Sequence, residues 1–175
     1  MARSSVRSYL EGRSNAMNTL LELYRHKTWA TLRLIEYCLG LDPQHLHATM
    51  AGTYGTIPAT LRHVVEAEED YYSVLTGEHV SEPFPAGLVR LEELAQRIRR
   101  LAPRWEVLAQ DLDLPGRMVT FPDGVSWPGA VLLAQAIHHA ADHRTHILSL
   151  LGPWGVEVPR LDVWAYAQST GLQVA

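Results

Sequence analysis

The strongest structural signal in this sequence is an apolar seam near its middle, which only a helix packed against other helices can bury. Between residues 91 and 112, large apolar side chains recur at steps of three and four: Leu91, Leu94, Ile98, Leu101, Trp105, Leu108 and Leu112. This spacing aligns them on one face of a helix. Pro103 lies inside the seam and predicts a kink or a split, because proline removes a backbone donor and clashes with the preceding turn.

Three more segments carry helical periodicity and end at glycine. They run from Asn18 to Leu39, from Thr56 or Ile57 to about Thr76, and from Ser126–Pro128 to Leu151. The face expected to be buried in the first of them consists of Leu21, Tyr24, Thr28, Leu32, Ile35 and Leu39. Glycine commonly follows the last turn of a helix, so these bounds agree with the periodicity. Four long helices with modest loops predict an all-α protein, an antiparallel-type bundle.

Shorter elements are expected between and after these helices. Asp42 followed by Pro43 predicts a brief helix with an aspartate cap, and residues 161–170 predict one short helix near the C-terminus. Met118–Phe121 and Val125–Trp127 flank Asp123–Gly124, which is a turn signal between β-forming residues. We therefore expect a small β-hairpin inserted before the last long helix.

Length and composition favour a single soluble domain. The chain has 175 residues, of which 47% are hydrophobic and 19% are charged. We expect one domain over residues 17–175, preceded by an extension over residues 1–16 that is rich in arginine and serine. Cys38 is the only cysteine, so no internal disulfide is possible and a reducing cytoplasm is the expected location. The net charge of -4 and the interspersed arginines argue against nucleic acid as a partner. No segment is apolar enough for a membrane span.

Three of the nine histidines predict a metal site. His139 and His143 are four residues apart, so their rings project from one face of the last long helix. His63 lies on the face of the second long helix that carries small and apolar residues. An antiparallel bundle can set His63 opposite this pair, which gives three imidazoles and one open coordination position. The alternative is that all three are hydrogen-bonded core residues. A zincin-type protease is excluded because no glutamate follows His139.

The sequence resembles the DinB/YfiT-like metalloenzymes over most of its length from about Met17. The resemblance rests on Trp29–Ala30, on Leu61–Val64 with Glu66 and Glu69 after it, and on residues 139–147. The family block typically reads His-x-x-x-His-Arg-Gly-Gln-Ile, and here Thr145 and His146 replace the Gly-Gln pair. The resemblance implies an up-down-down-up bundle, commonly dimeric, with a divalent metal held by His63, His139 and His143.

The resemblance also directs the expected function. Zinc or nickel is the first expectation for the metal, with iron or manganese as alternatives. The leading hypothesis is an enzyme that activates a low-molecular-weight thiol for S-transfer to a small electrophile, in detoxification or stress response. The alternatives are a metal-dependent hydrolase that activates water, and a non-enzymatic dimeric bundle whose metal is structural. Cys38 lies in an apolar pattern and is expected to be a buried residue rather than the nucleophile.

Five neighbours of the predicted ligands have more than one interpretation. His146 is either a partner of the metal site, as a fourth ligand or a hydrogen-bonding neighbour, or a boundary histidine. Glu66 and Asp142 either orient the imidazoles or are ordinary solvated charges. Arg144, like Arg62, either binds a carboxylate of the thiol or lies on a solvated helix face.

Overall fold

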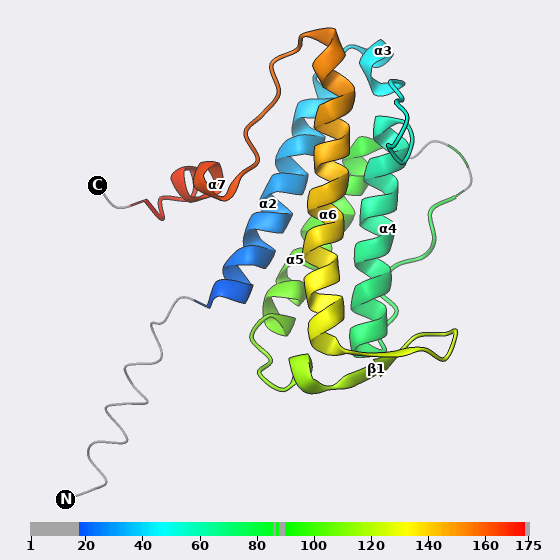
Figure 1. Ribbon diagram of the computed structural model, residues 1–175, viewed down its shortest axis with the longest axis vertical. Coiled ribbons are helices and arrows are strands. Elements are labelled where there is room, and N and C mark those ends of the chain that lie inside the picture. The colour runs from blue at the N-terminus through cyan, green and yellow to red at the C-terminus, as the bar shows by residue number, and fades with distance from the viewer. Residues whose placement is uncertain (1–17, 86, 88–89, 174–175) are drawn as a thin grey trace, which may run out of the picture.

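Four long helices form the protein, which we describe from a computed structural model covering residues 18–85, 87 and 90–173. These helices are α2 (Thr19–Leu39), α4 (Ile57–Thr76), α5 (Leu91–Leu108) and α6 (Gly129–Leu151). In Figure 1, α2 and α6 run upward while α4 and α5 run downward, so the bundle has the expected up-down-down-up order. Each of α2 and α4 packs against both α5 and α6, which leaves α2 and α4 diagonally opposed. The all-α prediction is confirmed.

Several helix ends lie at or next to the bounds that the sequence pattern predicted. The Asn18 side chain caps α2 by accepting hydrogen bonds from the backbone N–H groups of residues 20 and 21. Thr56 caps α4 by accepting a bond from the N–H of residue 59, and Gly77 ends that helix with φ of 76°. Asp42 caps the short α3 (Pro43–Leu46), and Asp162 caps α7 (Val163–Ser169). Both short helices were expected, and both are confirmed.

The expected length of α5 is wrong, and the split that was one of two possibilities at Pro103 is absent. The helix ends at Leu108, and the Leu112 side chain is 89% exposed instead of continuing the buried seam. The chain turns here because the Asp111 carboxylate accepts bonds from the next backbone N–H groups, those of residues 113 and 114, and a short 3-10 turn, η2 (Leu114–Gly116), follows. The helix also continues through Pro103 without a split. Pro103 is exposed, so water can satisfy the backbone carbonyl that the proline leaves unpaired.

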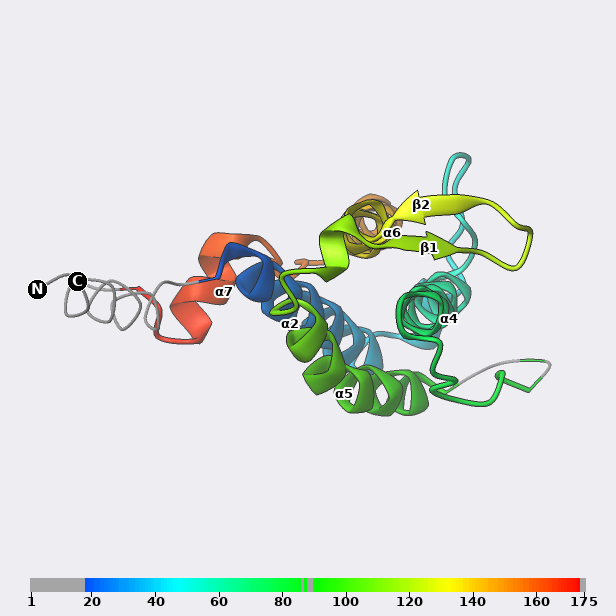
Figure 2. The ribbon, with the colours of Figure 1, turned by 90° about the horizontal axis from the view of Figure 1, so that it is seen from below.

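The expected β-hairpin is present and covers one end of the bundle. Strand β1 (Met118–Thr120) pairs antiparallel with β2 (Ser126–Pro128), and Val119 lies opposite Trp127. Figure 2 views the bundle from this end and places the hairpin beside the start of α6. Because β2 leads directly into α6, the hairpin connects the bottom of the bundle to the helix that carries two of the predicted ligands.

The interior contains two hydrophobic clusters. One is built around Leu34, Leu61, Ile98 and Ile147, and the other around Tyr24, Tyr72, Trp105 and Leu132. A buried layer of charge lies between them along the helices, made of Lys27, Glu68 and Arg144. The face predicted for α2 is only partly right. Tyr24 and Ile35 are buried, whereas Leu39 is 46% exposed and Lys27 is completely buried.

Candidate metal centre

The three predicted ligands lie together between α4 and α6. His63 is in the second turn of α4, and His139 and His143 face it from consecutive turns of α6. One nitrogen from each ring can be chosen so that all three lie within 4.8 Å of one another. The closest approach is 2.9 Å between Nε2 of His139 and Nε2 of His63. The ring centroids of His143 lie 4.8 Å from His63 and 4.5 Å from His139.

Two tyrosines flank the three histidines. Tyr54, in the loop before α4, stacks on His63 with 4.1 Å between ring centroids and meets His143 edge-on at 5.6 Å. Tyr71, two turns beyond His63 on α4, meets His139 edge-on at 5.8 Å. The Tyr71 hydroxyl accepts a hydrogen bond of 3.4 Å from the Gln135 side chain, which joins α4 to α6 one turn below His139. The two tyrosine rings therefore pack against the histidine rings from two sides.

The pKa values of the three histidines are lowered, which keeps their rings in the neutral form that can bind a cation. Partial burial, with smaller contributions from the neighbouring His143 and His63, lowers the pKa of His139 to about 4. Burial likewise lowers the pKa of His63 and that of His143. For His143, the neighbouring His63 and His146 lower the pKa as well. Each ring is thus neutral at pH 7, which is the form of imidazole that binds a metal ion.

The donor chemistry of this cluster fits a divalent metal. Nδ1 of His139 and Nδ1 of His143 are buried and have no hydrogen-bond partner within the described part of the chain. Three neutral imidazoles this close together direct lone pairs toward a shared point. A hydrogen bond between two rings uses the lone pair of only one of them, because the other ring must donate, whereas a single cation can accept all three lone pairs. The donor set is the His₃ type that suits zinc, nickel, iron and manganese.

The carboxylates considered as orienting groups form no hydrogen bond to the histidine rings. Glu66 accepts a 2.8 Å hydrogen bond from Arg62, and Asp142 is exposed on α6. Among residues 18–85, 87 and 90–173, no carboxylate forms a hydrogen bond to His63, His139 or His143. Both acids act on the site only through their charge, since Glu66 raises the pKa of His63 and Asp142 raises that of His139.

His146 lies beside the cluster rather than inside it. Its ring centroid is 5.4 Å from that of His143, and it is not one of the three residues whose nitrogens converge. This follows from helix geometry, because a residue three positions after His143 is rotated away from the line joining His139 and His143. The position of His146 disagrees with its interpretation as a fourth ligand, and its buried Nδ1 has no hydrogen-bond partner among the described residues.

Sequence reasoning missed the buried charges behind the histidines. Lys27, the only lysine of the chain, forms an ion pair with Glu68 across the bundle from α2 to α4. Arg144 donates hydrogen bonds to the Thr31 hydroxyl at 3.1 Å and to the Lys27 carbonyl at 3.5 Å, so its predicted place on a solvated face is wrong. Burial lowers the pKa of Lys27 and that of Arg144, the latter to about 10, while Glu68 opposes both shifts. Lys27 lies three residues after Tyr24 on the same helical face, and this spacing was the one feature of the sequence that could have indicated its burial.

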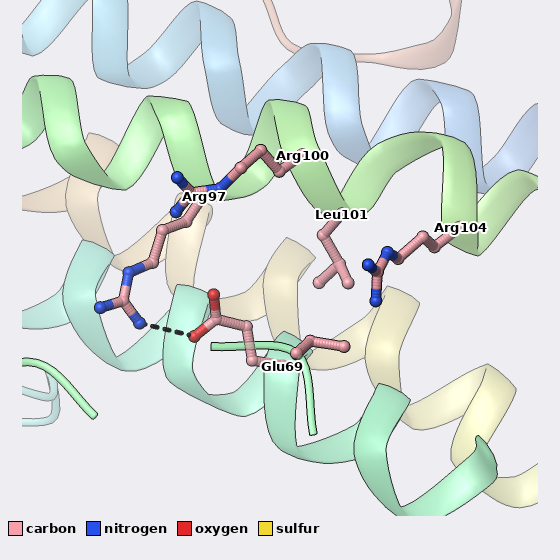
Figure 3. A pocket seen from close by; sticks show the side chains of 6 residues that line it. Glu69, Arg97, Arg100, Leu101 and Arg104 are labelled. Atoms are coloured by element: carbon pink, nitrogen blue, oxygen red, sulfur yellow. Dashed lines mark hydrogen bonds and ion pairs between the residues drawn. The ribbon is translucent and has the colours of Figure 1, made fainter. Parts of the chain in front are cut away.

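A polar cavity lies between α4 and α5, away from the histidine cluster, and is drawn in Figure 3. It is lined by Glu69, Val80, Arg97, Arg100, Leu101 and Arg104 and has a volume of about 70 Å³. Arg97 donates a 3.0 Å hydrogen bond to Glu69 and stacks on Phe84 at 3.5 Å. Arg104 lies 3.5 Å from Glu78. Because two of its three arginines already have acidic partners, this small cavity is a weaker candidate for a ligand than the histidine cluster.

Comparison with known proteins agrees with this fold. The chain matches the DinB family over residues 15–174 and belongs to that family. A solved structure of a DinB-like protein from Bacillus cereus superposes on it with a TM-score of 0.65 and 18% sequence identity, over 82% of this chain and 96% of the other. At that identity the likeness shows a common fold alone. A search of curated proteins finds none that matches the chain. Of the helices described, none has the length and apolar character to cross a membrane.

Proposed function

We propose that this protein is a divalent-metal-dependent enzyme whose metal is held by His63, His139 and His143. The observation that carries the proposal is the convergence of three neutral imidazoles from two helices, with one nitrogen of each ring within 4.8 Å of the others. Three protein ligands leave a position open for a substrate, which distinguishes a catalytic site from a closed structural one. A divalent cation bound there supplies Lewis acidity that lowers the pKa of a thiol or of water near neutral pH.

We further propose that the group activated is a low-molecular-weight thiol that adds to a small electrophile. Water is a weak acid, and hydrolases usually add a general base to remove its proton, yet no described carboxylate forms a hydrogen bond to the histidine cluster. A thiol has a pKa near 8.5 and needs less help to ionise. In the addition, the sulfur–carbon bond forms and the thiol proton ends on the adduct, so no further reactant is needed.

The thiol must come from the substrate and not from the protein. Cys38 is the only cysteine, it is fully buried against the core, and burial raises its pKa to about 12. Such a thiol is neither ionised nor accessible at neutral pH. Tyr54 and Tyr71 flank the histidines and are placed to contact the apolar part of a bound substrate. A homodimer and a cytoplasmic location remain predictions.

The first experiment measures bound metal in protein purified without chelator, in the wild type and in single His→Ala variants at positions 63, 139 and 143. We expect one divalent ion per chain, lost in each variant. The matched control is His138→Ala, because His138 precedes His139 but faces an apolar groove next to Leu20 and Ile137. Retention of metal by the three variants, or its equal loss from the control, contradicts the assignment.

The second experiment measures conjugation of small thiols to a chromogenic electrophile in the metal-loaded and metal-free protein. We expect turnover only with metal and with added thiol. Metal-dependent cleavage of ester or amide substrates without thiol would favour the hydrolase instead. Metal binding with neither activity, together with unfolding when the metal is removed, would favour a structural metal.

A further inference from the structure

The charged layer in the bundle interior lies at the level of the histidine cluster. Glu68 follows His63 by five residues on α4, and Arg144 directly follows His143 on α6. Both charged side chains point to α2, where Lys27 pairs with Glu68 and where the Thr31 hydroxyl and the Lys27 carbonyl accept from Arg144. Helix α2 contributes no member of the histidine cluster, yet it contacts both helices that do.

These contacts determine how α4 and α6 are rotated about their axes. A helix turns by about 100° per residue, so His63 is rotated by about 140° from Glu68 and His143 by about 100° from Arg144. When Glu68 and Arg144 are held toward α2, the three histidines are directed away from α2 and toward each other. The layer also joins α2 to α4 across the diagonal of the bundle, where the helices have few other contacts.

We propose that Lys27, Glu68 and Arg144 are positioning residues, which hold α4 and α6 in the rotation that brings His63, His139 and His143 together. The inference rests on the proposed metal site and assigns to the buried charges a role beyond folding. A metal site tolerates only small errors, because metal–nitrogen bonds are about 2.0–2.1 Å long and binding geometry must be held within about 0.5 Å. A modest rotation of either helix therefore weakens metal binding before it disturbs the packed core.

Stability and metal affinity can be separated experimentally, since replacing a buried ion pair by apolar residues of similar size is often neutral or stabilising. The test variant is Lys27→Met combined with Glu68→Leu. We expect unchanged or higher thermal stability of the metal-free protein, with metal affinity weakened by about 10- to 100-fold, the range for losing groups that orient metal ligands. We also expect the visible absorption spectrum of bound Co²⁺ to change, because it reports the geometry of coordination.

The matched control is Arg97→Met combined with Glu69→Leu. This pair is also buried and also reaches α4, but it joins α4 to α5 and does not touch α6. We expect it to leave both metal affinity and the Co²⁺ spectrum as in the wild type. A milder second variant, Thr31→Val, removes one acceptor of Arg144 while preserving side-chain shape, and we expect it to weaken metal binding in the same direction.

The outcomes distinguish this inference from the proposed function. If the wild type binds metal and the Lys27/Glu68 variant binds it equally well, the positioning role is wrong and the metal site stands. Equal weakening in the Arg97/Glu69 control would also overturn the role. If the wild type binds no metal, the proposed function fails, and the inference fails with it. If the Lys27/Glu68 variant does not fold, the Thr31→Val variant tests the positioning role instead. Metal affinity as high as that of the wild type in Thr31→Val then overturns the proposal.

Discussion

Removing Lys27 alone should be among the most destabilising single changes in the chain. Lys27 is 0% exposed and Glu68 is 2% exposed, so Lys27→Met leaves a carboxylate in the interior without its cation. Breaking a buried pair in this way costs about 3–5 kcal/mol. For a chain of this length each kcal/mol lowers Tm by about 2–4 °C, which gives a drop of about 6–20 °C.

Adding Glu68→Leu to Lys27→Met should restore the lost stability, because both charges are then removed. Urea unfolding and thermal melts of the metal-free protein, followed by circular dichroism, measure the two variants and the coupling between them. The control is Arg33→Met, which breaks an exposed pair with Glu36 and should cost at most about 1 kcal/mol. The reasoning is refuted if Lys27→Met costs no more than this control, or if the double variant is as unstable as the single one.

Three further predictions follow from single positions. Because the folded-state pKa of His139 lies near 4, below the value of about 6.5 in the unfolded chain, the metal-free protein should lose stability as pH falls from about 6.5 toward 4, and His139→Gln should flatten that decline in pH-dependent melts. The Cys38 thiol should react with a thiol-specific dye at least about a thousandfold more slowly in native than in urea-unfolded protein, since opening a domain costs at least about 5 kcal/mol; equal rates would contradict its burial. Gly129→Ala should destabilise by about 1–3 kcal/mol because its Cβ would lie 2.2 Å from the Leu114 carbonyl oxygen, whereas Gly152→Ala, with open space around it, should be neutral in the same melts.

Local signals in the sequence were sufficient to predict the helices and the hairpin and most of their ends. The caps at Asn18 and Thr56, the stop at Gly77 and the turn at Asp123–Gly124 act over a few residues, so a single sequence shows them. The same approach failed at Leu112, which continues the apolar spacing of α5 but is exposed. Periodicity there was overridden by the turn at Asp111, whose side chain bonds to the following backbone.

The sequence predicted the three histidines of the candidate site but not the side chains that contact them. The spacing of His139 and His143 and the resemblance that adds His63 identified all three residues that converge. Which groups hold them could not be read from the same pattern, because Glu66 and Asp142 are plausible neighbours along the helices and yet make no hydrogen bond to the rings. The side chains that stack against the rings, such as Tyr54, come from a loop whose path has no periodic signal.

The sequence by itself determined four long helices, a hairpin before the last of them, and three histidines on faces that can meet. Each of these depends on contacts between residues close in the chain, whose geometry is set by the helix or turn itself. Only the tertiary structure decided that Lys27 and Arg144 are buried. Their partners are far away in sequence, with Lys27 and Glu68 separated by 41 positions and Thr31 and Arg144 by 113. A charge can be buried only where the fold supplies its partner, so its place depends on how the helices pack and not on its own neighbours.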